Sequence, residues 1–466
     1  MNFASGTFFV FIAIFFIVWP WARKENDRRW TIISIASLVF YGWFDWRFIF
    51  LLLGSAVVDF VAASKIEKDR HRKKWLIVSI IGNLGALATF KYADFGVLQI
   101  NSASSLLGYE PMALPGFVLP IGISFYTFQS MSYTIDVYRR QMKTADNFWH
   151  FFSYLSMFPQ LVAGPIVRAK ELLPQLATPG KYSAEGRESG LRRMALGFFQ
   201  KVVIADNCAP IVNELFQQDL TDQGAAAWIA SALFGIQIYA DFAGYSNIAI
   251  GIAKWCGYQF PDNFRHPYLA SGFKDFWGRW HITLSTWFRD YVYIPLGGSR
   301  KGESRGIINA MFTMTVSGLW HGANMTFIMW GAFHGTCLCV ERLLGNRIKL
   351  PQTIFVKLLQ RVLFLLLVVF GWMIFRAENM AQVGIIGESM LFPPFGGDVS
   401  INSLLIINMC VALIGFFLIE CAAIWRTITA TRPYAGAWLA RLAIITAIFC
   451  SVFLRGPGDD FIYFQF

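Results

Sequence analysis

Charged side chains are scarce in this sequence. Asp, Glu, Lys and Arg make up 15% of its 466 residues, whereas a soluble domain typically carries about 25%. Hydrophobic residues account for 56% of the chain, and the mean hydropathy is +0.47. These residues form successive long apolar runs, which excludes a chain built around one large water-surrounded core. The composition therefore indicates a polytopic membrane protein.

Motifs for metals and disulfides are also missing. No C-x-x-C or H-E-x-x-H pattern occurs, and the seven cysteines lie mostly in or beside apolar runs. We therefore expect no metal site, no cofactor and no disulfide framework. The first apolar run, residues 3–19, has no basic segment before it and no Ala-x-Ala cleavage site after it. We interpret it as a retained span and not as a signal peptide.

Lys and Arg are absent from residues 94–115, although the net charge of the chain is +11. They gather in three other polar gaps, at 23–29, 65–74 and 139–143. If each apolar run crosses once, these three gaps share one side, which the positive-inside rule makes cytoplasmic, with the N-terminus outside. The charge is thus a topology signal and not a sign of nucleic-acid binding. Anionic lipid or an anionic cytosolic substrate is a secondary explanation.

Apolar runs of spanning length recur along the whole chain. A membrane-spanning helix needs about 20 mainly apolar residues. We expect some candidate segments to be re-entrant or interfacial and about eleven to cross the membrane. With no detachable soluble region, residues 1–466 are predicted to form a single membrane-embedded all-α domain. The candidates are 3–19, 30–44, 48–64, 75–93, 116–137, 148–167, 191–215, 225–254, 304–321, 323–344, 354–376, 403–424 and 436–455.

Two of these segments look interrupted. Residues 158–165, FPQLVAGP, place two prolines and a glycine in an apolar stretch, which predicts a re-entrant segment lining a cavity, or a simple proline kink. In residues 238–251, Asp241 and Tyr245 are four apart and share a helix face. Asp241 is expected to face the protein interior. A structural hydrogen bond between helices and a substrate contact are both open for it.

A histidine interrupts the apolar stretch 311–335, within Trp320-His321-Gly322-Ala323-Asn324. An ionisable residue at membrane depth is a functional-site candidate, and an imidazole can accept and return a proton near neutral pH. The glycines beside it let a backbone or a ligand come close. The alternative is a histidine that is simply hydrogen-bonded between packed helices.

The stretch 273–291, FKDFWGRWHITLSTWFRDY, has aromatic residues at helical spacing. This predicts an amphipathic helix that lies in the interface or covers a polar cavity. His281 falls at one rim of its apolar stripe and Arg279 near the other, while Ser285 lies on the opposite face. A rim histidine that is merely solvated is the alternative. The basic residues after the helix, within 300–305, can meet anionic lipid or the phosphates of a cytosolic donor.

Six stretches together carry a recognisable pattern. They are PIGISFYTFQSMSYTIDVYR (120–139), FPQLVAGPIVR (158–168), YADFAGYS (239–246), FWGRWHITLSTWFRDYVYIPLGG (276–298), SGLWHGAN (317–324) and FIYFQF (461–466). From about residue 35 onward the chain resembles the membrane-bound O-acyltransferases. It is most similar to the branch of bacterial alginate O-acetylation proteins and the D-alanyl transfer protein of teichoic acid modification.

The resemblance implies a ring of helices around a thin central channel, entered by one cytosolic and one outward-facing funnel. It also implies that His321, the histidine of W-H-G, is catalytic. His281, in R-W-H, is the second histidine of the family pattern and is expected near the donor path. His334 is a poor substitute, because thirteen residues from His321 it lies on a different helix face.

Acyl transfer from a thioester to a hydroxyl needs a base for the hydroxyl proton and a donor for the oxyanion. We expect His321 to be the base, since burial tends to keep an imidazole neutral. Trp320 is expected to wall the site, and Asn324 to orient His321 or hold the thioester carbonyl. His281 is expected to bind the donor or to share proton transfer. The further candidate substrate contacts are Arg279, Ser285, Asp241 and Tyr245.

The expected donor is acetyl-CoA on the cytosolic side. The expected acceptor lies outside a bacterial inner membrane, as an exported polysaccharide such as alginate or cellulose, or a periplasmic acetyltransferase that works with polysaccharide synthesis and export machinery. A transporter or flippase would also use broken helices and intramembrane His and Asp residues, but no internal repeat is visible. A non-catalytic scaffold of a polysaccharide synthase is a third hypothesis.

Overall fold

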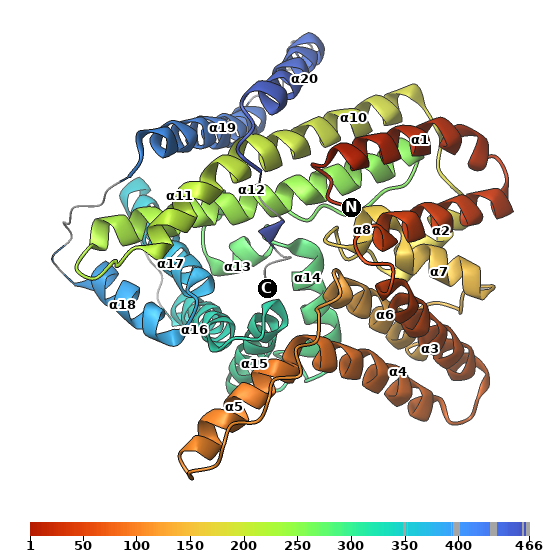
Figure 1. Ribbon diagram of the computed structural model, residues 1–466, viewed down its shortest axis with the longest axis horizontal. Helices are drawn as coiled ribbons and strands as arrows, with labels where there is room; N and C mark the ends of the chain where they lie inside the picture. Colours follow the sequence, from red (N-terminus) through yellow and green to blue (C-terminus); the bar gives the residue numbers. More distant parts are fainter. Residues whose placement is uncertain are drawn as a thin grey trace. The chain divides into compact units, whose positions relative to one another are not determined.

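The computed structural model describes residues 1–347, 351, 353–392, 394, 401–428, 436–458 and 461–462. This part of the chain is built from helices (Figure 1). Its elements include no strand, which confirms the all-α prediction. Its contacts form two compact units. The N-terminal unit comprises Met1–Arg193 and Ile248–Pro261, and the C-terminal unit comprises Met194–Asn247 and Asp262–Phe466. Whether the chain acts as one domain stays a prediction.

The N-terminal unit is built from apolar helices, most of which are joined by short connections. Its helix α10 (Ala184–Phe198) and the last turns of α12 (Gly224–Cys256) continue into the C-terminal unit. Its other helices are α1 (Gly6–Ala22), α2 (Asn26–Gly42), α3 (Phe48–Lys68), α4 (Arg72–Leu87), η1 (Ala88–Tyr92), α5 (Ala93–Ser105), α6 (Ile123–Tyr138), α7 (Phe148–Ser156), α8 (Phe158–Leu161) and α9 (Ala169–Ala177).

The proline-containing segment of this unit is broken, as the sequence predicts. Helix α7 ends at Ser156, α8 lasts four residues, and the chain is then non-helical until α9. Residues 157–167 are all buried, so their free backbone groups need partners within the protein. The Tyr154 hydroxyl donates to the Val167 carbonyl at 3.0 Å, and the Phe158 N–H donates to the Ser37 hydroxyl at 3.1 Å. The interruption is thus stabilised by side chains and is more than a proline kink.

The C-terminal unit carries both histidine motifs. Its core is a continuous cluster of buried apolar side chains rich in Trp and Phe. Besides its parts of α10 and α12, its helices are η2 (Phe199–Ala205), α11 (Asp206–Gln217), η3 (Pro267–Leu269), α13 (Phe273–Trp277), α14 (Ile282–Phe288), η4 (Arg289–Tyr293), α15 (Glu303–His321), α16 (Met325–Arg347), α17 (Ile354–Arg376), α18 (Met380–Leu391), α19 (Ser403–Ile428) and α20 (Gly436–Phe453).

Helices α15 and α16 form a tight antiparallel pair (Figure 1). Glycines make this approach possible: a β-carbon on Gly318 would lie 2.1 Å from the Phe327 carbonyl oxygen, and one on Gly331 would lie 2.4 Å from the Met314 carbonyl oxygen. Only a residue without a side chain fits such a contact. Gly318 is one of the glycines beside His321 predicted to let a backbone or a ligand come close, and the group that comes close is the backbone of α16.

The prediction of one amphipathic helix over 273–291 is wrong. The segment forms two short helices, α13 and α14, and the chain turns between them. Gly278 ends α13, and His281 adopts a left-handed backbone with a φ of 42° just before α14. The chain is drawn out of the helix because the Ile282 N–H donates to the Asn263 carbonyl at 2.9 Å. His281 is consequently buried and not a solvated rim residue.

Six helical stretches in the described part of the chain are long and apolar enough to cross a membrane, by length and composition. They support a multi-pass membrane protein, whereas the count of about eleven crossings stays a prediction. These stretches are Phe48–Lys68, Arg72–Ser105, Ala184–Gln217, Gly224–Cys256, Ile354–Arg376 and Ser403–Ile424.

Candidate active site

His321 is the last residue of α15, at the point where the chain turns toward α16. Its side chain is 3% exposed and packs among aromatic rings. The ring centroids of Trp320, Trp330 and Phe375 lie 5.0, 5.1 and 5.4 Å from that of His321. The next residue, Gly322, is extended, and a β-carbon there would lie 2.1 Å from the Phe327 ring. The helix end and its packing therefore place the imidazole in a closely walled, apolar setting.

His281 is held by hydrogen bonding. The Asn263 amide oxygen accepts from the Thr283 N–H at 3.3 Å and from the Thr283 hydroxyl at 2.9 Å. The same oxygen lies 3.1 Å from Nδ1 of His281, and the Asn263 amide nitrogen donates to the Ser246 hydroxyl at 3.0 Å. An amide oxygen can only accept, so Nδ1 of His281 must carry the proton. In the neutral ring the lone pair is then on Nε2.

The surroundings of His281 keep its ring neutral. It is 0% exposed, and the Phe242 ring meets it edge-on at 4.6 Å. Burial lowers the pKa of His281 to about 3, because an apolar environment disfavours the charged form. The left-handed backbone conformation at this residue is uncommon outside glycine, and such conformations gather at functional sites. A neutral, oriented imidazole is suited to accepting a proton or a hydrogen bond.

Trp320 lies against both histidines. Its ring centroid is 5.0 Å from that of His321 and 6.2 Å from that of His281, and its side chain is 4% exposed. His281 and His321 are 40 positions apart in the sequence, yet with Trp320 they form one group of three buried rings. Two proton-accepting side chains beside an apolar wall can support acid–base chemistry with little water present.

The chain matches the family model for MBOAT, the membrane-bound O-acyltransferase family, over residues 9–383. The chain belongs to the membrane-bound O-acyltransferase family. Both histidines fall within the matched residues, and membership makes this protein an O-acyltransferase.

Named relatives of this O-acyltransferase include alginate O-acetylases, the group that the sequence motifs indicate. A probable alginate O-acetylase of Pseudomonas aeruginosa is 40% identical over 398 residues, which cover 84% of this chain and 75% of the relative. The corresponding protein of Azotobacter vinelandii is 41% identical over 391 residues, covering 82% and 76%. A peptidoglycan O-acetyltransferase of Helicobacter pylori is 33% identical over 396 residues, covering 78% and 74%.

Three further candidate residues of this O-acyltransferase bond to nearby groups. Asn324 donates to the Glu378 carbonyl at 2.7 Å and accepts from the Thr326 N–H at 3.1 Å. The Ser285 hydroxyl donates to the Trp280 carbonyl at 3.2 Å. Arg279 pairs with Asp275 at 2.7 Å and lines a cavity whose described lining includes neither His281 nor His321. Their substrate contacts stay predictions.

Asp241 is buried in α12, as predicted, and joins an ionic cluster. Its carboxylate lies 2.8 Å from the ammonium group of Lys201, which also lies 2.9 Å from Asp206. The other Asp241 oxygen accepts from the Ile462 N–H at 2.7 Å. The Tyr245 ring, one turn along the same face, lies 4.7 Å from that of Phe461. These contacts hold the described part of FIYFQF against α12, whereas residues 463–466 of that motif lie outside the described residues.

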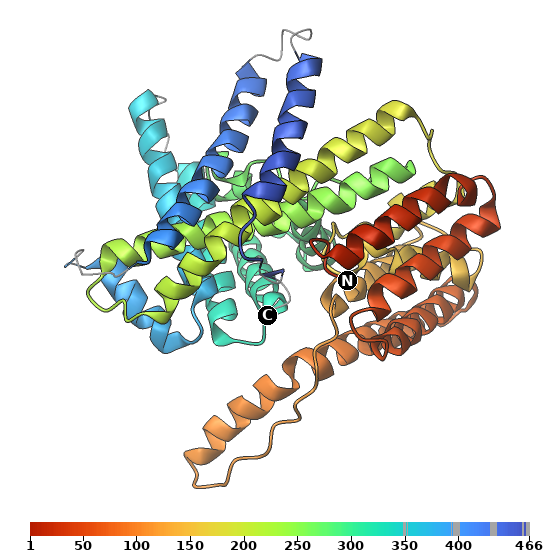
Figure 2. The same ribbon diagram turned by 45° about the horizontal axis from the view of Figure 1, so that its top comes forward.

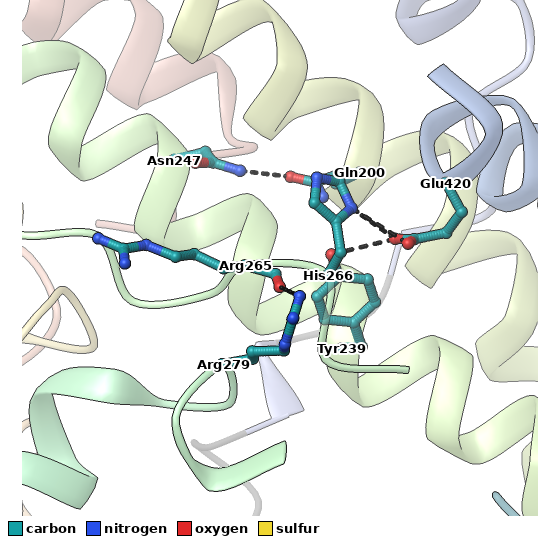
Figure 3. Close-up of polar contacts among 7 residues, drawn as sticks. All are labelled: Gln200, Tyr239, Asn247, Arg265, His266, Arg279 and Glu420. Atoms are coloured by element: carbon teal, nitrogen blue, oxygen red, sulfur yellow. Dashed lines mark hydrogen bonds and ion pairs between the residues drawn. The ribbon is translucent and has the colours of Figure 1, made fainter. Parts of the chain in front are cut away.

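Sequence reasoning missed several of these groups. Asn263 lies 18 residues before His281 in a stretch with no motif of its own, so no local signal singles it out. Lys201 lies in the π-helical turn η2, which hydropathy does not reveal. His266 and Tyr239 reach Glu420 of α19 at 3.0 and 3.3 Å (Figure 3). No group of three or more His, Cys, Asp or Glu in the described ranges could hold a metal ion.

Proposed function

We propose that this O-acyltransferase takes an acetyl group from a cytosolic thioester, acetyl-CoA, and passes it on for O-acetylation of an exported polysaccharide. The single observation that carries the proposal is the buried group of His281, Trp320 and His321, with Asn263 orienting one imidazole. The names of the relatives, alginate O-acetylase and peptidoglycan O-acetyltransferase, support acetyl as the acyl group and a polysaccharide as the final acceptor.

The proposed reaction needs no cofactor. The acceptor hydroxyl oxygen forms a bond to the thioester carbonyl carbon, and its proton goes to His321. The carbon–sulfur bond then breaks, and the departing sulfur receives that proton. Positioned acid–base groups contribute roughly 10²–10⁴-fold to such steps. In this proposal His281 stays neutral and offers Nε2 for orienting the donor or for sharing the proton transfer.

The proposed setting is a bacterial inner membrane with the N-terminus in the periplasm. The basic gaps at 23–29, 65–74 and 139–143 support a cytosolic entrance for an anionic donor. On the other side, we propose a periplasmic acetyltransferase as the partner that completes transfer to the polymer. A ring of helices around a channel would connect the two sides. Membrane lipid is the remaining partner, and the charge pattern does not require nucleic acid.

The proposal is tested with the purified full chain, acetyl-labelled acetyl-CoA and a soluble polysaccharide fragment or the partner protein. We expect release of free CoA and label on the acceptor, both of which disappear in His321→Ala. Movement of polysaccharide across vesicles without CoA release would instead identify a transporter. Normal polymer acetylation by cells that carry only His321→Ala would refute the assignment of the base.

A further inference from the structure

A large cavity lies in the C-terminal unit, away from the two histidines. Its volume is about 1110 Å³, and its walls come mainly from α19, α20 and the region around η2. Pockets for drug-sized ligands usually measure roughly 300–1,000 Å³, so this cavity has room for a larger molecule. Figure 2 shows α19 and α20, in blue, as neighbouring helices of this unit.

The cavity wall is continuous with an apolar surface of a membrane-spanning candidate. Ile414 and Leu418 line it while remaining 62% and 63% exposed. Both lie on α19, whose residues Ser403–Ile424 form one of the candidate spans. The lining side of this helix thus merges with the side that faces lipid in a bilayer. Apolar chains fill such a space more favourably than water does.

The polar part of the lining is basic. It contains His266, Arg279 and Arg361 and, among the described residues, no Asp or Glu. Two of these groups have partners, because His266 pairs with Glu420 at 3.0 Å (Figure 3) and Arg279 pairs with Asp275 at 2.7 Å. Arg361 is exposed on α17 and makes no ion pair or hydrogen bond within the described part of the chain. One guanidinium is therefore available to an anion.

We propose that this cavity binds one anionic phospholipid, with its acyl chains along α19 and α20 and its phosphate at Arg361 and Arg279. The described lining of this cavity contains none of His281, Trp320 and His321, the group that carries the proposed acyl transfer. An apolar cavity open toward the bilayer selects a lipid tail, and a guanidinium selects a phosphate by charge and by paired hydrogen bonds. Bound there, the lipid fills the space beside the His266–Glu420 pair and buttresses α19.

The test compares phosphatidylglycerol with phosphatidylcholine of identical chains. Each is titrated onto the full chain in neutral detergent, and bound lipid is counted by native mass spectrometry. We expect one tightly held phosphatidylglycerol and about fivefold weaker binding of phosphatidylcholine, the factor for one cation near a lipid headgroup of net negative charge, because choline balances the phosphate charge of phosphatidylcholine. Arg361→Ala should remove this preference. Lys357→Ala is the matched control, because it removes one positive charge a turn earlier on α17, outside the lining.

A second pair of variants tests the tail. Ala422→Phe places a ring in the cavity and should reduce binding of both lipids, whereas Cys421→Phe, on the neighbouring residue outside the lining, should not. Equal affinity of the wild type for the two lipids would overturn the proposal, as would equal effects of Arg361→Ala and Lys357→Ala. Stoichiometric displacement of the lipid by acetyl-CoA would assign the cavity to the acyl donor instead.

Discussion

The rings of His321 and His281 both contact Trp320, yet they are positioned in different ways. His321 ends a long helix and is walled by Trp320, Trp330 and Phe375, so its orientation depends on how α15 packs. His281 precedes a short helix in a left-handed conformation, and the Asn263 amide determines which of its nitrogens carries the proton. Packing excludes water from the ring of His321, whereas hydrogen bonding determines the tautomer of His281. Substitutions that disturb only one of these should separate their contributions.

The largest expected effect is that of His321→Ala. Loss of the base should lower O-acetylation at least about 100-fold, the lower bound for general acid–base catalysis. The measurement is acetyl incorporation into polymer, normalised to the amount of protein in the membrane fraction. Substantial activity of this variant at normal abundance would show that His321 has a structural role and is not the base.

His281→Ala should have the next largest effect, and a larger one than His334→Ala. His334 is also 0% exposed, but it packs against Phe273 and Trp277 and makes no ring contact with Trp320. We expect a loss of about tenfold or more for His281→Ala, less than the roughly 100-fold or more expected when the base itself is removed. Initial rates of CoA release measure both variants. Equal, mild losses would remove His281 from the site.

Asn263→Asp should shift the pH dependence more than the maximal rate. In the native protein, burial lowers the pKa of His281 to about 3, so the ring stays neutral as pH falls through the usual histidine range near 6.5. A carboxylate at position 263 favours the imidazolium and raises that pKa. The neutral form is present above the pKa and is lost below it. Activity of the variant should therefore fall at a higher pH than in the wild type.

The control for this shift is Asn263→Leu, which removes the hydrogen bond without adding charge. It should lower the rate at all pH values, but the pH at which activity falls on the acid side should be the same as in the wild type. Identical pH profiles for Asn263→Asp and the wild type would show that Asn263 does not influence the titration of His281.

The smallest expected change in activity follows from Gly318→Ala. The new methyl group meets the Phe327 carbonyl, and such overpacking typically costs about 1–3 kcal/mol. Thermal unfolding in detergent should show a lower Tm, with a partial loss of rate through His321. Gly345→Ala on α16 is the control, because a β-carbon there meets nothing within 4 Å. It should leave Tm unchanged or raise it slightly.

Hydropathy and motif spacing predicted much of this organisation, including the all-α fold, the broken segment 158–165 and the interior position of Asp241. They did not predict the turn at His281, because the aromatic spacing of 273–291 continues through Gly278 as if the helix did. That turn depends on Asn263 and Thr283, whose backbone and side-chain bonds form only after folding. The pairing of Lys201 with Asp241 is likewise invisible in sequence, since each lies in a different apolar run.

The bond between Asp241 and the Ile462 N–H joins groups 221 residues apart. During translation α12 therefore enters the membrane long before this partner has been synthesised. Lys201 and Asp206 precede Asp241 in the chain, so the ion pair of Lys201 with Asp241 can already form when α12 leaves the insertion machinery. The order in which the ribosome delivers these residues thus gives the Asp241 carboxylate a counter-charge early, and the Ile462 N–H arrives later as a further partner in a cluster of one positive and two negative charges.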